Sequence, residues 1–187
     1  KINTERIIDA LKSSGYDFTR YPDGDEHFFD STLEEADPEV EGKIKHLESI
    51  TGPLPLTIKE FWRAIGSISL VGFIEDWPEF SDQLVVASVA DNIESIEEWQ
   101  EFKEECDDHA EDPYILFISP DDYQKDNCEG GQYYNIELPC LTVDGLVKNA
   151  PSETTFIDFL REAFEAKGFP GLEEPPEELK NLELLRI

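Results

Sequence analysis

The sequence is short of cations and of cysteine, and both shortages exclude classes of protein. Lys and Arg number 15 against 44 Asp and Glu, which gives the 187-residue chain a formal net charge of -29. Direct binding to nucleic acid or to an anionic membrane depends on clustered cations, so both are disfavoured. The cysteines, Cys106, Cys128 and Cys140, are widely spaced and form no CxxC pair, so no disulfide framework is indicated.

Long apolar runs, glycosylation acceptors and methionine are also missing. No stretch approaches the roughly 18 consecutive apolar residues of a membrane-spanning helix. Residues 1–15 have the pattern of an amphipathic helix rather than that of a signal segment, and no Asn-x-Ser/Thr sequence occurs. A reducing, cytoplasmic location fits these absences best. The lack of Met even at position 1 suggests that the native start lies upstream.

The apolar content is sufficient for one core. Hydrophobic residues make up 39% of the chain and aromatic residues 11%, enough to offset the loss of chain entropy on folding. No Pro/Gly-rich linker separates two periodic halves, and no internal repeat occurs. We therefore expect a single domain.

Helix-like and strand-like patterns follow one another along the chain. Apolar residues at helical spacing predict helices within 1–15, 37–52, 57–66, 93–112 and 154–168. Apolar, partly β-branched stretches predict strands at 67–74, 83–90, 114–118, 133–139 and 140–147. The remaining stretches are an acidic loop at 23–41, a polar connection at 119–131, and a terminal helix or strand at 178–187. This order lacks the even alternation of a parallel sheet, so we predict an α+β fold with a mostly antiparallel sheet flanked by helices.

Motifs for nucleophilic catalysis and for phosphate binding are absent. The nearest approach to a GxSxG elbow, at residues 66–69, lacks the second glycine and leads into a strand rather than a helix. Gly130-Gly131 lacks both the lysine of a P-loop and the GxGxxG spacing of dinucleotide sites, so it indicates a turn. We expect neither a catalytic residue nor a cofactor.

One pair of residues has a spacing seen in metal sites. Cys106 and His109 can project from the same side of a helix. Asp107, Asp108 or Cys128 can complete a set of ligands. No second paired spacing supports such a site, so we expect no metal.

Acidic residues beside aromatic residues are the best candidates for carboxylates of raised pKa. Asp76 precedes Trp77, and Asp121 and Asp122 precede Tyr123. Such carboxylates would serve an enzyme that acts on a sugar or a basic substrate, but loop capping and solvation explain them as well. The enzyme hypothesis predicts a deep pocket that contains a carboxylate of strongly raised pKa.

The predicted helix at 93–112 carries a high density of negative charge. Residues 94–112 include ten acids and one Lys, while an apolar face remains on the same helix. The acids are either a solvated helix face or a negative patch that docks on a cationic cleft. Aromatic residues can anchor such an interface, or they can belong to the core. The predicted partner-binding surface comprises Asp76, Trp77, Glu79, Glu101, Glu104, Glu105, Asp108, Asp121, Asp122, Tyr123, Tyr133 and Tyr134.

The stretch LPLTIKEFWRAIGSISLVGF, at 54–73, combines several signals. Thr57-x-x-Glu60 predicts a capping box at the start of a helix. Phe61 and Trp62 then lie on the buried face of that helix. The helix ends at Gly66, and an apolar strand follows.

This stretch resembles the SUKH superfamily, which includes fungal cell-wall-synthesis regulators and many bacterial toxin-immunity proteins. A second stretch supports the resemblance, because TTFIDFLR at 154–161 followed by GFPG at 168–171 looks like the closing helix of bacterial members. Residues 66–68 depart from the Asn-Gly-Gly-like turn of many members.

The resemblance implies one domain in which residues 1–36 are an N-terminal helix and acidic loop extension, 37–171 the family core and 172–187 an acidic extension. It implies a protein-binding domain with no enzymatic activity, and it carries over no catalytic or contact residue. The leading hypothesis is a bacterial immunity protein, a monomer or weak homodimer, that masks the active site of a basic toxin domain such as a nuclease. The alternative is a regulatory interaction module without a toxin partner.

Overall fold

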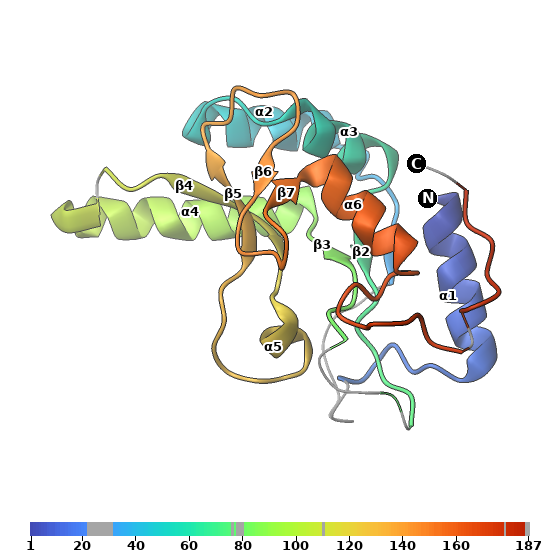
Figure 1. Ribbon diagram of the computed structural model, residues 1–187. Coiled ribbons are helices and arrows are strands. Elements are labelled where there is room, and N and C mark those ends of the chain that lie inside the picture. The colour runs from blue at the N-terminus through green and yellow to red at the C-terminus, as the bar shows by residue number, and fades with distance from the viewer. Residues whose placement is uncertain (22–31, 76, 78–80, 110, 178, 186–187) are drawn as a thin grey trace.

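Amphipathic periodicity produces the helices of the computed structural model, which describes the chain except residues 22–31, 76, 78–80, 110, 178 and 186–187 (Figure 1). The helices of the described residues are α1 (Ile2–Ser14), α2 (Val40–Thr51), α3 (Leu56–Ala64), α4 (Val89–Glu105), the 3-10 helix η1 (Asp107–His109), α5 (Asp122–Lys125) and α6 (Phe156–Glu165). All five predicted helices are confirmed. The additional helix α5 lies where we expected a polar connection, and it begins where the carboxylate of Asp121 accepts the N–H of Gln124.

The strands are short. Those of the described residues are β1 (Leu33–Glu34), β2 (Ser67–Ser69), β3 (Val85–Val86), β4 (Tyr114–Ser119), β5 (Tyr134–Leu138), β6 (Leu146–Val147) and β7 (Thr154–Thr155). They pair antiparallel in three small sheets, β1-β2-β3, β4-β5 and β6-β7. The α+β class is confirmed, but the single sheet that we expected is divided. The ladder between β2 and β3 is brief because the N–H of Leu84 donates to the carbonyl of Gly168 (2.8 Å) rather than to a strand.

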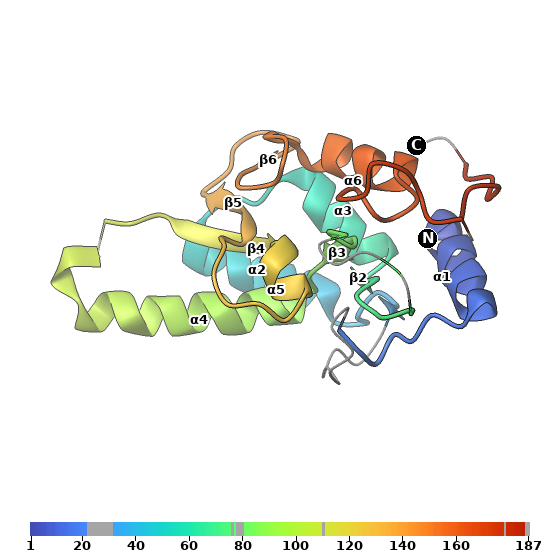
Figure 2. The same cartoon turned by 60° about the horizontal axis from the view of Figure 1, so that its bottom comes forward.

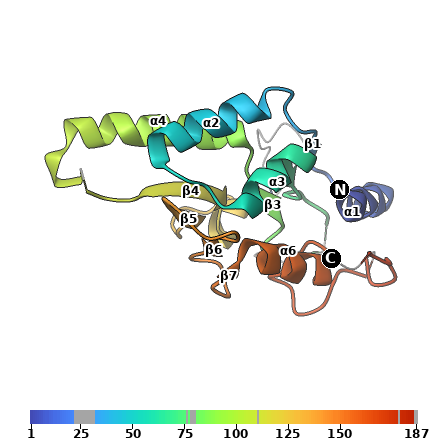
Figure 3. The same ribbon diagram turned by 90° about the horizontal axis from the view of Figure 1, so that it is seen from above.

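The elements form layers around the β4–β5 ribbon. Seen from above, α2 and α4 lie side by side on one side of β4 and β5, and β6, β7 and α6 lie on the other (Figure 3). α1 lies at the opposite end of the molecule from the C-terminal half of α4 (Figure 1). That half of α4 and the start of β4 project beyond the other elements (Figure 2).

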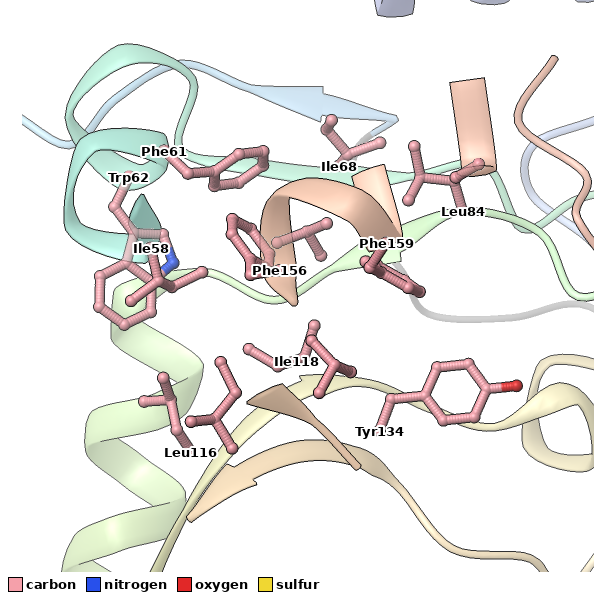
Figure 4. Close-up of a cluster of buried hydrophobic side chains, with 14 of the residues drawn as sticks. Ile58, Phe61, Trp62, Ile68, Leu84, Leu116, Ile118, Tyr134, Phe156 and Phe159 are labelled. Carbon is pink, nitrogen blue, oxygen red and sulfur yellow. The ribbon is translucent and has the colours of Figure 1, made fainter. Parts of the chain in front are cut away.

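The core gathers where α3 and α6 meet the strands (Figure 4). Ile58 and Trp62 of α3 and Phe156 of α6 are fully buried. The ring of Phe61 packs edge-on against that of Phe156, with 5.6 Å between centroids. The indole N–H of Trp62 donates to the carbonyl of Ala87 (3.0 Å), which ties α3 to the segment after β3. The core predicted for the stretch 54–73 is therefore confirmed.

The capping box predicted for α3 is wrong. Pro55 occupies the N-cap, and the hydroxyl of Thr57 donates instead to the carboxylate of Asp144 (2.8 Å). The same carboxylate accepts the N–H of Ile157 in the first turn of α6 (3.3 Å). Glu60 pairs with Arg63 at 2.7 Å. Asp144 thus serves the N-termini of two helices at once, which a local motif cannot reveal.

The closing motif holds the segment before β3 in place. The hydroxyl of Thr155 caps α6 by accepting the N–H of Asp158 (3.4 Å). Gly168 has φ +91°, and its carbonyl accepts the N–H of Leu84. Gly171 donates its N–H to Ser81 (3.1 Å), and a Cβ at this glycine would lie 2.7 Å from the Ser81 backbone. The left-handed backbone conformation at Gly168 and the close backbone approach at Gly171 therefore explain the two glycines of the GFPG sequence.

The C-terminal segment is held by a side chain of α1. Described residues 179–185 contain turns and irregular structure instead of the predicted terminal helix or strand. The carboxamide of Asn3 donates to the carbonyl of Leu185 and accepts its N–H, each at 2.8 Å. The side chain of Asn3 therefore replaces the neighbouring strand that this segment lacks.

Candidate partner-binding groove

An open groove of about 800 Å³ runs between α4 and the β4–β5 ribbon. Its residues come from α4, from β4 and from the residue that precedes β5. They are Asp91, Glu94, Ser95, Glu98, Trp99, Phe102, Ile115, Phe117 and Tyr133. Apolar and aromatic side chains supply the floor, and carboxylates supply one wall, which is the composition of a binding site rather than of a solvated face.

The contribution of α4 is a continuous stripe of side chains. Its six groove residues, between positions 91 and 102, recur at i, i+3, i+4, i+7, i+8 and i+11, the spacing of one helix face. At 1.5 Å per residue the stripe is about 16 Å long. Asp91 and Glu94 occupy its N-terminal half, Glu98 lies beside Trp99 in its C-terminal half, and Phe102 ends the stripe. The groove therefore has a charged end and an aromatic end.

The floor of the groove is the outer face of β4. Along this strand Leu116 and Ile118 are fully buried in the core, and the alternate residues Ile115 and Phe117 line the groove. The ring of Tyr133 packs edge-on against that of Phe117, with 4.9 Å between centroids. Both faces of β4 are thus apolar, but only one of them is covered by the core.

The aromatic end is held by ring packing. Trp99 and Phe102 stack with 5.2 Å between centroids, and the ring of His109 lies 5.3 Å from that of Phe102. Phe102 remains 40% exposed. The indole nitrogen of Trp99 is buried and has no hydrogen-bond partner among the described residues, so packing alone holds this ring.

Asn92 fixes the distance between α4 and β4. This residue is fully buried, and its side-chain oxygen accepts the N–H of Phe117 (2.8 Å). Its side-chain nitrogen donates to the carbonyls of Phe117 (2.9 Å) and Ser88 (3.0 Å). Ser88 and Asp91 form a capping box that starts α4 one turn earlier. Neither Asn92 nor this box was among the predicted functional residues.

The charge of the groove is negative. The residues that line it include Asp91, Glu94 and Glu98 and neither Lys nor Arg. Glu94 and Glu98 also border a smaller hollow of about 350 Å³ between α2 and α4, together with Glu101. The one Lys of α4, Lys103, is engaged elsewhere, because its ammonium lies 4.5 Å from the centroid of the Tyr114 ring.

The structure disperses the residues that we predicted as a partner-binding surface. Tyr133 lines the groove, and Trp77 packs against Tyr16 and Phe169 at 5.3 and 5.2 Å. Asp76 and Glu79 lie outside the described residues. The predicted acids Glu101, Glu104, Glu105 and Asp108 are exposed on the later turns of α4 and on η1.

Two predicted surface residues are buried, which corrects their assignment. Tyr134 is 2% exposed and Asp121 is 4% exposed. Tyr134 lies in the core beside a buried ion pair, in which the ammonium of Lys125 contacts the carboxylate of Asp82 at 2.5 Å. Burial lowers the pKa of Lys125, although Asp82 opposes this shift, and burial together with Asp82 raises the pKa of Tyr134. These groups belong to the interior.

The rest of α5 is at the surface. Asp122 is half-buried in its first turn, and Tyr123 is 49% exposed. Neither residue is among those that line the groove. The predicted acidic-aromatic cluster at 121–123 is thus divided between the interior and a surface separate from the groove.

Cys106 and His109, the candidate metal-binding pair, are not part of a larger set of metal ligands among the described residues. His109 pairs with Asp112 at 2.9 Å, and Cys106 ends α4. Within the described ranges, His, Cys, Asp and Glu form no group of three or more that could hold a metal ion.

Comparison with protein-family models, with curated proteins and with solved structures found no match. In the described part of the chain, each helix is too short or too polar to cross a lipid bilayer. The groove and its charge are therefore the features on which a functional proposal can be based.

Proposed function

We propose that this chain is a non-enzymatic protein-binding domain that captures a cationic protein through the acidic groove beside α4. The observation that carries the proposal is the combination of an aromatic floor with a wall of carboxylates on a chain of net charge -29. Aromatic anchors supply most of the affinity in protein interfaces, whereas complementary charge speeds the encounter and selects the partner.

The partner class that fits best is a basic bacterial toxin domain, and the protein would then be its immunity protein. A nuclease must hold phosphate, so its active-site cleft is cationic. An acidic domain seated in that cleft masks the active site without any chemistry of its own. The resemblance of residues 54–73 and 154–171 to toxin-immunity proteins supports the same proposal.

The test is to look for a basic toxin-like protein among the products of the neighbouring genes and to use it in a binding and inhibition assay. We expect a 1:1 complex of nanomolar affinity by calorimetry, and loss of toxin activity in proportion to the amount of complex. Association should slow with added salt, because complementary fields speed such encounters by roughly 10- to 1000-fold at low ionic strength. Tight binding without inhibition, or no binding, would contradict the toxin-neutralising role.

A charge-matched pair of variants separates the groove from overall charge. The double variant Glu94→Gln, Glu98→Gln removes two charges beside the groove, and Glu5→Gln, Asp9→Asn removes two from α1, at the other end of the molecule. We expect the groove variant to associate about tenfold more slowly at low salt and the α1 variant to associate nearly as fast as the wild type. Equal rates for both variants would leave only the net charge as the cause.

A further inference from the structure

We infer that the groove binds one amphipathic helix of the cationic partner, laid along α4 with its apolar face on the aromatic floor and its basic residues against the carboxylates. This inference rests on the proposed function, and it specifies the form of the ligand. It concerns the residues between Asp91 and Phe102 of α4, together with Ile115, Phe117 and Tyr133.

The shape of the groove favours a helix. The α4 side chains that line it form a straight stripe along three turns, at the spacing that one helix presents to a packed neighbour. The stripe is about 16 Å long, which matches about 11 residues of a second helix. A compact small ligand would not need a row of contacts along three helical turns.

The layering of the fold also favours a helix. α2 and α4 lie side by side and cover one side of the β4–β5 ribbon (Figure 3). Ile115 and Phe117 are on the face of β4 opposite the buried Leu116 and Ile118. A further helix beside α4 would cover these side chains in the manner that apolar strand faces are covered in α+β proteins.

The charge distribution identifies the chemistry of that helix. Asp91, Glu94 and Glu98 lie within the first two turns of the stripe, and neither Lys nor Arg is among the groove residues. Lys or Arg side chains at one end of the bound helix would pair with these carboxylates, while its apolar residues reach Trp99 and Phe102. A second copy of this chain does not fit, because it brings the same acids and a net charge of -29 to the contact.

A synthetic peptide provides a probe that does not depend on the natural partner. The peptide has about 15 residues, with Leu along one face and Lys and Arg along its flanks. A scrambled peptide of identical composition is the control, because it keeps the charge and loses the apolar face. We expect the amphipathic peptide to bind at least about tenfold more tightly by calorimetry, to gain helical circular dichroism on binding, and to shift the NMR resonances of the groove residues.

Two variants of the protein locate the binding site. Phe102→Ala removes an exposed aromatic ring from the groove and should weaken peptide binding by about tenfold or more. Leu141→Ala removes an equally apolar side chain, 85% exposed, from the loop between β5 and β6, and should leave the affinity unchanged. Unchanged circular dichroism spectra would establish that both variants are folded.

The outcomes distinguish this inference from the proposed function. Equal binding of the two peptides, or no effect of Phe102→Ala, would overturn the helix-in-groove inference. If Phe102→Ala still neutralised the toxin at wild-type affinity, the toxin-neutralising role would stand and the groove assignment would fail. If the amphipathic peptide bound in the groove but no basic toxin were neutralised, the inference would stand and the toxin-neutralising function would fail.

Discussion

Replacing Asn92 by Ala tests whether one buried side chain holds α4 against β4 and thereby sets the width of the groove. The wild-type carboxamide exchanges two hydrogen bonds with the backbone of Phe117, at 2.8 and 2.9 Å, and donates a third to Ser88. Asn92 is fully buried, so water can replace these bonds only if α4 moves away from the strand. The variant therefore leaves the Phe117 N–H and carbonyl without partners.

The expected loss of stability is large. An orphaned buried polar group costs about 1–3 kcal/mol, so two such groups should lower the free energy of unfolding by about 2–6 kcal/mol. Typical domains have a total stability of only about 5–15 kcal/mol. Asn92→Asp should lose at least as much at neutral pH, because a carboxylate keeps the acceptor for the Phe117 N–H but faces two carbonyl oxygens without a donor. Equilibrium urea unfolding measures both changes.

Gln100→Ala is the matched control on the same helix. Its side chain makes only a long contact with Glu104 (3.4 Å), so the variant should stay within about 0.5 kcal/mol of the wild type. Hydrogen exchange gives a second measurement, because the Phe117 amide should lose protection in Asn92→Ala beyond the loss in overall stability. If Asn92→Ala matched the control and the Phe117 amide exchanged at the wild-type rate, Asn92 would not hold α4 in place.

Three further predictions concern the interior. Asp144→Ala should lower the free energy of unfolding by about 1–3 kcal/mol, because the carboxylate serves the N-termini of α3 and α6; wild-type stability in thermal unfolding would contradict this role. Lys125→Met should lower the free energy of unfolding by about 3–5 kcal/mol, because it leaves the buried Asp82 charged and unpaired. Adding Asp82→Asn should restore most of this loss. A double-mutant cycle measured by urea unfolding tests this, and a double variant no more stable than Lys125→Met would refute it. Burial raises the pKa of Tyr16. The stability that its protonated hydroxyl contributes is therefore fully present below about pH 10. As the pH rises further, this contribution to the free energy of unfolding falls by about 1.4 kcal/mol per pH unit. Tyr16→Phe should remove that part of the slope in alkaline urea titrations, and an unchanged slope would rule out this origin.

Periodicity along the sequence was a reliable guide to the helices and the core. Ile58, Trp62 and Phe156 are buried as their spacing predicts, and the hydroxyl of Thr155 caps α6. These features depend on neighbours within a few residues, because one turn of a helix determines which side chains share a face. The antiparallel pairing was also correctly predicted, although its division into three sheets was not.

The groove was missed because two patterns were ambiguous. The run at 114–118 predicts a strand, but an apolar run does not reveal whether each face of that strand is covered. Trp99 and Phe102 belong to the apolar face predicted for this helix, but Phe102 is 40% exposed and both residues line the groove. The acids singled out on α4 were the later ones, whereas Glu94 and Glu98 border the groove.

By itself the sequence determined the α+β class, the helices, the buried face of α3 and the excess of negative charge. The tertiary structure alone decided which apolar face of β4 lacks a cover, and which buried polar side chains hydrogen-bond the backbone of another segment. Asn92 bonds the backbone of Phe117, and Asn3 bonds that of Leu185 in the same two-way manner. Such contacts join residues far apart in the sequence, and neither residue carries a local signal of its partner. Their positions follow only from how the helices and strands pack.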